Sequence, residues 1–140
     1  MIRDRKTKTL AASYVPAKGQ DTYAVKFMSG VIKRLGYRKI LNMSDGERSL
    51  LALKKKAAEL AGVDAVPREV PVGDSKANGV AESAVKEVKA AMRAMKSSLE
   101  AKLGMPLEDS DPVIAWLPMA AADLISRFRV GDDGKTAERR

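Results

Sequence analysis

The sequence predicts an α/β fold in which helices cover a small sheet. Short runs of β-branched and apolar residues, bounded by turn residues, are typical of strands, and longer segments with apolar residues at helical spacing are typical of helices. The two kinds alternate in the order strand, helix, strand, helix, weak strand, helix, helix, which favours a layered α/β architecture. The chain has 140 residues and 45% hydrophobic content, which suffices for a single core.

The first half of the chain supplies two predicted strands and a helix. Residues 7–15 mix β-branched and apolar side chains and suit a strand. A helix is predicted over residues 22–35, with Asp21 as its N-terminal cap and Gly36 as its stop. Residues 37–43 then form a short, mostly buried strand.

The middle of the chain is predicted to contain a second helix, a weak strand and a loop. The helix covers residues 47–61, with the three lysines at 54–56 mostly outward, and ends at Gly62. Residues 63–72 contain two prolines, which indicate an edge strand or an extended connector. Residues 74–79 are polar and are predicted to be a loop.

Two further helices complete the prediction. An apolar stripe at helical spacing predicts a long helix over residues 80–103. The last helix covers residues 112–128, with Asp111 as its cap, and is expected to be kinked or interrupted at Pro118. Residues 131–140 form a polar tail.

Composition limits the chemistry that the chain can perform. It has 26 basic and 18 acidic residues, a net charge of +8, and neither cysteine nor histidine. This excludes disulfides, thiolate zinc sites and catalysis by Ser-His-Asp or Cys-His groups. Aromatic residues make up only 4%, which argues against recognition of single strands on aromatic platforms. The basic charge favours a polyanion such as nucleic acid, or serves solubility alone.

The beginning of the chain and its hydropathy indicate a location inside the cell. Met1 to Lys6 lack the apolar run of a signal peptide, and no stretch approaches the roughly 20 apolar residues of a membrane span. We therefore expect an intracellular protein, nuclear or cytoplasmic, without a membrane partner.

Two acidic residues far apart in the sequence are candidates for a shared site. Asp45 follows an apolar strand, and Glu82 lies in the first turn of the long basic helix. A strand end and a helix start can share one face of an α/β sheet, where two carboxylates repel unless a cation such as Mg²⁺ neutralises them. The pair therefore indicates metal-assisted phosphoryl transfer on nucleic acid. The alternative is an ordinary turn Asp and an ordinary helix-start Glu.

The helix that carries Glu82 also displays cations and follows a polar dipeptide. Three cations share one helical face with Glu82: Lys86, Lys89 and Arg93. A phosphate chain can bind along them, or the face is simply solvated, with pairs such as Glu82 to Lys86. The dipeptide Asn78-Gly79 is expected to approach substrate from the loop and to set the entry angle of Glu82; its alternative role is that of a turn.

These motifs resemble the catalytic core of retroviral and retrotransposon integrases, in the ribonuclease H-like superfamily. Ser44-Asp45-Gly46-Glu47 is similar to the family's Ser-Asp-Asn-Gly motif, one residue shorter, and Asn78-Gly79-Val80-Ala81-Glu82 is similar to its Asn-Gly-x-x-Glu motif. The three later segments that resemble the family's pattern in a degraded form are Trp116, Ser126-Arg127 and Thr136-Ala137-Glu138-Arg139.

The resemblance implies a ribonuclease H-like domain over residues 1–130, an incomplete mixed sheet packed by about four helices, and the tail at 131–140. It implies DNA as partner and metal-dependent cutting and joining of DNA strands, as in an integrase or endonuclease from a transposable element. The implied catalytic and metal-binding residues are Asp45 and Glu82, with Mg²⁺ or Mn²⁺. The implied nucleic-acid contacts are Asn78, Gly79, Lys86, Lys89 and Arg93.

One departure weakens the implied activity. The family's first strand and its Asp have no counterpart here, and Asp4 lies in a basic turn, so its role as a substitute is the less favoured hypothesis. Without that strand, residues 7–15 lose a neighbour, and we expect unpaired backbone groups and marginal stability as a monomer. We expect weak metal binding and little activity unless an upstream segment supplies the missing Asp.

Two alternatives remain open at this point. One is a non-catalytic, basic nucleic-acid-binding remnant, and the other is a helical interaction protein whose charges confer only solubility. Besides DNA, the partners under consideration are a second copy of the chain and the remainder of a polyprotein.

Overall fold

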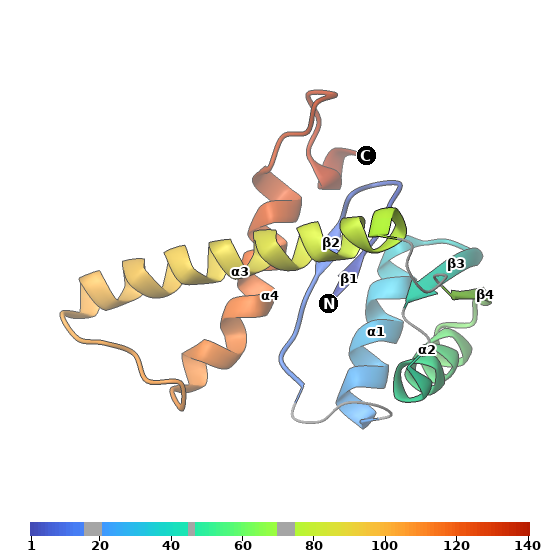
Figure 1. Ribbon diagram of the computed structural model, residues 1–140, viewed down its shortest axis with the longest axis horizontal. Coiled ribbons are helices and arrows are strands. Elements are labelled where there is room, and N and C mark those ends of the chain that lie inside the picture. Colours follow the sequence, from blue (N-terminus) through green and yellow to red (C-terminus); the bar gives the residue numbers. More distant parts are fainter. Residues whose placement is uncertain (16–20, 45–46, 70–74) are drawn as a thin grey trace. The chain divides into compact units, whose positions relative to one another are not determined.

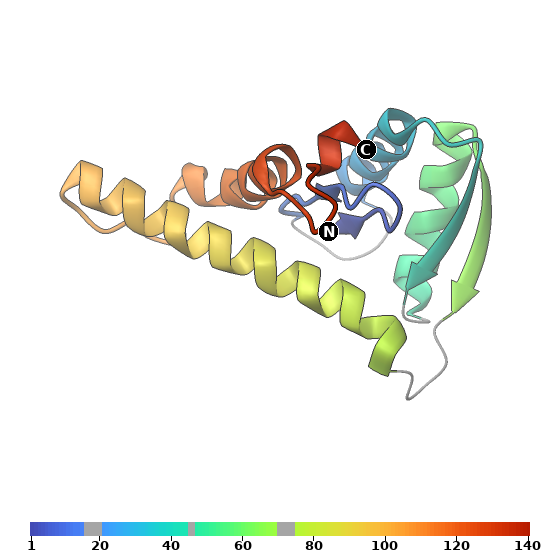
Figure 2. The same ribbon diagram turned by 90° about the horizontal axis from the view of Figure 1, so that it is seen from above.

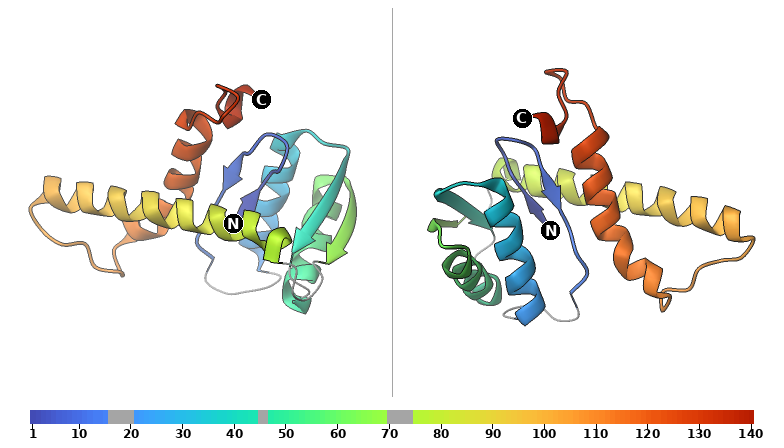
Figure 3. Two further views of the ribbon diagram at one scale, coloured as in Figure 1. Left: turned by 45° about the horizontal axis from the view of Figure 1, so that its top comes forward. Right: turned by 180° about the vertical axis from the view of Figure 1, so that it is seen from behind.

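The computed structural model describes residues 1–15, 21–44, 47–69 and 75–140, and within these residues the protein has four α-helices and two two-stranded sheets (Figure 1). The chain divides into two compact units, one made of Met1–Tyr14 with Gly79–Arg140 and the other of Val15–Asn78. Each unit has its own strands and helices (Figure 3). The α/β class predicted from the sequence is confirmed.

The unit Val15–Asn78 is built on a parallel pair of strands. Strands β3 (Lys39–Ser44) and β4 (Asp64–Glu69) pair in parallel and are joined through helix α2 (Arg48–Ala61). Helix α2 packs against both strands, and helix α1 (Thr22–Leu35) packs against α2 (Figure 2). This is a strand–helix–strand crossover, the connection that parallel strands require.

Local end signals set the helix boundaries in this unit. The side chain of Asp21 accepts a hydrogen bond of 3.0 Å from the backbone N–H of Ala24, as expected for an N-terminal cap. Helices α1 and α2 end at Gly36 and Gly62, which have φ angles of 71° and 72°. Only glycine adopts this left-handed conformation without strain, which is why both stops were predictable.

The other unit packs a short hairpin against two helices. Strands β1 (Ile2–Arg3) and β2 (Leu10–Ala11) pair antiparallel, and β2 lies against helix α4 (Pro112–Phe128). Helix α3 (Ser75–Leu103), from Gly79 onward, contributes the other wall of the core. The buried residues that form this core are Leu10, Ala12, Ala84, Val88, Ala121 and Ala122.

The hairpin turn uses the carboxylate of Asp4. Its Oδ2 accepts hydrogen bonds from the backbone N–H of Thr7 at 2.9 Å and from the Thr7 hydroxyl at 2.6 Å. An Asp that bonds its own backbone in this way is a standard turn former. The interpretation of Asp4 as a turn residue is therefore confirmed.

The described strands form one antiparallel pair in one unit and one parallel pair in the other. Strand β2 covers only Leu10–Ala11 of the predicted 7–15, and β1 was not predicted. Each strand pairs with the neighbour nearest in sequence, which is the connection that chains favour. These two pairs alone do not define a ribonuclease H-like strand order.

Helix α4 differs from the prediction at its N-terminal cap, and of the kink or interruption predicted at Pro118 only the interruption is excluded. It continues through Pro118 without interruption. The carboxylate of Asp111 makes no bond to the helix start; it accepts instead from the backbone N–H of Glu108 at 2.8 Å. Pro112 occupies the helix start as predicted, because its missing N–H costs nothing there.

The polar tail folds back on helix α4 of its own unit, Met1–Tyr14 with Gly79–Arg140. Its short 3₁₀ helix η1 (Ala137–Arg139) contacts α4 and buries Ala137. Arg140 pairs with Asp133, and its hydrogen bond lowers the pKa of that carboxyl to about 2. The tail is polar, but it is held by specific contacts.

Candidate nucleic-acid interface

Helix α3 presents one charged face to solvent. Glu82, Lys86, Lys89 and Arg93 are all exposed, whereas Ala84 and Val88 on the other side are 0% and 4% exposed in the core. This division follows from helical spacing, because residues three, four and seven apart lie on one side. The face predicted from the sequence therefore lies at the surface.

The cations on this face have no carboxylate partner among the described residues. Within the parts that the structure describes, Glu82, Lys86, Lys89 and Arg93 form no ion pair, so the Glu82–Lys86 pair that the spacing favours is not made. The nearby Glu87 instead forms ion pairs with two arginines of its own unit. Cations without a carboxylate partner are open to phosphate groups.

Glu87, on the side of α3 next to the charged face, pairs with two arginines. It lies 3.8 Å from Arg3 and 2.5 Å from Arg129, joining the hairpin and the residue after α4 to α3. The Nε of Arg3 is buried without a hydrogen-bond partner. Glu87 therefore fixes the helix within the unit and leaves the exposed cations unneutralised.

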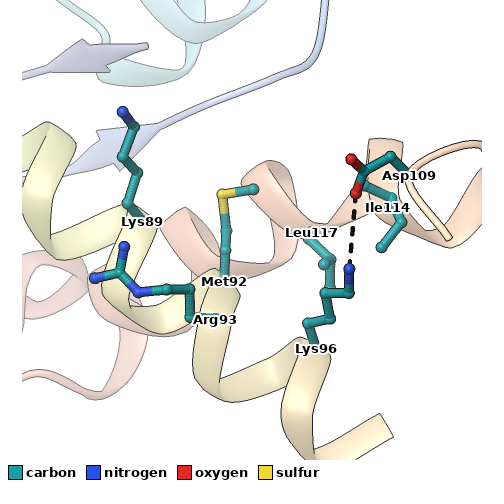
Figure 4. A pocket seen from close by; sticks show the side chains of 7 residues that line it. All are labelled: Lys89, Met92, Arg93, Lys96, Asp109, Ile114 and Leu117. Atoms are coloured by element: carbon teal, nitrogen blue, oxygen red, sulfur yellow. Dashed lines mark ion pairs between the residues drawn. The ribbon is translucent and has the colours of Figure 1, made fainter. Parts of the chain in front are cut away.

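A pocket opens next to the same cations, between α3 and the start of α4 (Figure 4). Lys89, Arg93 and Lys96 supply its positive charge, and Lys96 forms an ion pair of 3.7 Å with Asp109. Its apolar lining residues are Met92, Ile114 and Leu117. The sequence predicted the cations of this pocket, because they follow from helical spacing. It did not predict the packing of α4 against α3, which forms the apolar lining.

Asn78 and Gly79 are not in a loop. Helix α3 begins at Ser75, so the backbone of both residues is helical, and the predicted loop over 74–79 is wrong for residues 75–79. Glycine costs about 1 kcal/mol relative to alanine inside a helix, but a long helix propagates through such a position once it has formed. The side chain of Asn78 lies outside the described residues, as does residue 74.

The two predicted acids are not both described. Asp45 lies outside the described residues, while Glu82 is exposed on α3. In residues 1–15, 21–44, 47–69 and 75–140, no three carboxylates gather into a group that would hold a metal ion. Of the two predicted ligands only Glu82 is described, so the expected metal site depends on Asp45.

Lys54 is a buried cation that the sequence interpretation placed among outward lysines. It is 5% exposed, and its Nζ donates hydrogen bonds of 2.8 Å to the carbonyl of Asn42 and 2.8 Å to Oγ of Ser44. Both acceptors belong to the last three residues of β3, and Ser44 directly precedes Asp45 in the sequence. The signal was its spacing, because Lys54, Ala57 and Ala58 share one buried stripe of α2.

The degraded motifs near the C-terminus have separate structural roles. Trp116 is 63% exposed on α4. Ser126 is buried, and its hydroxyl bonds both backbone groups of Leu10. Residues 136–139 lead into and form η1.

The chain matches no known protein-family model and no curated protein. In the described ranges, no helix has the length and apolar character that crossing a bilayer requires.

Proposed function

We propose that this chain binds the phosphate backbone of DNA through the exposed face of α3. The observation that carries the proposal is the row of Lys86, Lys89 and Arg93, all exposed and none of them paired with a carboxylate of the described chain. The net charge of +8 adds a favourable long-range field.

The spacing of the three cations suits a phosphate chain. Lys86 and Arg93 are seven residues apart, which corresponds to ~10 Å along the helix. Successive phosphates of one DNA strand rise by ~3.4 Å, so the row spans the rise of about three phosphates. Neutralising them releases condensed counterions, which makes binding strongly dependent on salt.

The test is fluorescence anisotropy of a labelled DNA duplex over a range of salt concentrations. Lys86→Gln, Lys89→Gln and Arg93→Gln are each expected to weaken binding about three- to tenfold and to lower the salt slope by about 0.9. The matched control is Lys102→Gln, because Lys102 is exposed on the opposite side of the same helix. Equal weakening by the control, or binding that is indifferent to salt, would contradict the proposal.

We further propose that this surface belongs to an integrase-like, ribonuclease H-like core of a retrotransposon over residues 1–130. Asp45 and Glu82 would hold Mg²⁺ or Mn²⁺, which would supply Lewis acidity at a DNA phosphate, while Lys86 and Lys89 would hold the strand. The support is the motif resemblance together with the exposure of Glu82 at the start of the basic row.

This second step is tested by a DNA nicking and strand-transfer assay with Mn²⁺. The chain is expected to show weak or no activity, because a two-metal site needs a further carboxylate. Asp45→Asn and Glu82→Gln are run beside it, with DNA binding as the control that both variants retain. Robust activity that both substitutions abolish would overturn the expected inactivity and assign the two acids to catalysis.

A further inference from the structure

The pocket beside the basic row of α3 combines an apolar floor with a cationic rim. It has a volume of about 230 Å³ and is formed within one unit, by α3, the following loop and the start of α4. Met92, Ile114 and Leu117 form the floor, and Leu117 is only 4% exposed. Lys89 and Arg93 stand on the rim without a carboxylate partner among the described residues (Figure 4).

The far end of the pocket is polar. Lys96 lies 3.7 Å from Asp109 and 3.9 Å from Glu100, so this cation is already neutralised. The free positive charge is thus confined to Lys89 and Arg93. An occupant that matches this pattern has a negative group at one end, an apolar or planar body, and polar atoms at the other end.

We propose that the pocket takes the base of one unpaired nucleotide whose flanking phosphates rest on Lys89 and Arg93. This proposal rests on the proposed DNA binding and names the form of DNA preferred. The base lies against the thioether of Met92 and the side chain of Ile114, and its exocyclic groups meet the Lys96–Asp109 pair. Arginine beside a base also provides a planar guanidinium on which bases stack.

The size of the pocket favours one base of a polymer over a free small ligand. Typical small-molecule sites enclose ~300–1,000 Å³, which is larger than this pocket. A nucleotide in a strand needs room only for its base, because its phosphates bind outside on the rim. The chain has few aromatic residues, and this floor uses none, so it differs from the aromatic platforms that the composition argues against.

A base within a duplex enters this pocket only after it is unpaired and unstacked, which costs a few kcal/mol. The structure therefore assigns a preference for single-stranded over duplex DNA to this pocket. Charge complementarity sets the phosphates on the rim, and the apolar floor distinguishes a strand with bases from a bare backbone.

The test compares the full chain binding to an oligothymidylate and to an abasic oligomer of equal length and equal phosphate number. The strand with bases is expected to bind about fivefold or more tightly. Ile114→Asp, which places a carboxylate on the floor, is expected to remove this preference, whereas Lys102→Gln retains it. Since Ile114→Asp also risks misfolding, the methyl signal of Met92 in the unaltered chain is followed by NMR. It is expected to shift with the thymidylate strand and to stay in place with the abasic one.

Equal affinity for the two strands, with Met92 unmoved and Lys89→Gln still weakening both, would overturn the base pocket and leave phosphate binding intact. No binding of either strand at low salt would overturn the proposed function itself. The two failures are therefore distinguishable.

Discussion

Replacing Lys54 by methionine is expected to lower the free energy of unfolding of the unit Val15–Asn78 by about 2–3 kcal/mol. Lys54 is 5% exposed, and its Nζ donates to the carbonyl of Asn42 and to Oγ of Ser44, both at 2.8 Å. Methionine keeps the apolar stem and removes the ammonium, so the loss reports the polar interactions of Lys54 and not its packing. Hydrogen bonds to a charged group contribute ~1.5–3 kcal/mol each.

The measurement is chemical denaturation of the full chain, with amide hydrogen exchange of β3 to localise the effect. Lys55→Met is the matched control, because Lys55 is the exposed neighbour on the same helix and such changes stay within ~0.5 kcal/mol. A Lys54→Met variant as stable as the original would mean that desolvating the ammonium costs as much as its bonds return.

The same lysine bears on the predicted site. Ser44 directly precedes Asp45 in the sequence. The hydrogen bond from Lys54 to Ser44 therefore anchors the residue next to the predicted metal ligand. If the structural role is correct, Lys54→Met loosens the end of β3 and increases amide exchange at Met43 and Ser44 more than at Lys39. Uniform exchange along β3 would contradict that role.

Local signals explain which parts of the fold were predictable. Asp21, Gly36 and Gly62 set helix ends through bonds and φ angles that involve only nearby residues, and their positions were correct. The start of α3 was missed because Asn78-Gly79 is a strong turn signal that the long helix overrides. The hairpin of β1 and β2 was missed because both strands have only two residues, too few to give a strand pattern in the sequence.

The candidate site divides in the same way. Exposure of Lys86, Lys89 and Arg93 follows from spacing along a single helix, so the sequence sufficed. A meeting of Asp45 with Glu82 is a long-range property, set by tertiary contacts that spacing does not encode. Lys54 was predicted to point outward because lysine is usually exposed, but its position on the buried stripe of α2 places it inside.

Ser126 explains why strand β2 does not need the neighbour that the resemblance assigns to it. Its Oγ accepts a hydrogen bond of 2.9 Å from the N–H of Leu10 and donates one of 3.1 Å to the carbonyl of Leu10. Leu10 is 2% exposed, so these groups have no access to bulk water. A helix side chain thus satisfies backbone groups that were expected to be unpaired.

Ser126→Ala is accordingly expected to destabilise the unit that contains α3 and α4 by about 2–3 kcal/mol, because it leaves a buried donor and a buried acceptor without partners. Amide exchange at Leu10 is expected to rise more than at Val88, which stays bonded within α3. Ser97→Ala, an exposed serine on α3, is the control and is expected to change stability by less than ~0.5 kcal/mol. An unchanged exchange rate at Leu10 would show that another group protects this strand. A rise confined to Leu10 and its neighbours would show that one hydroxyl on α4 protects the outer side of strand β2.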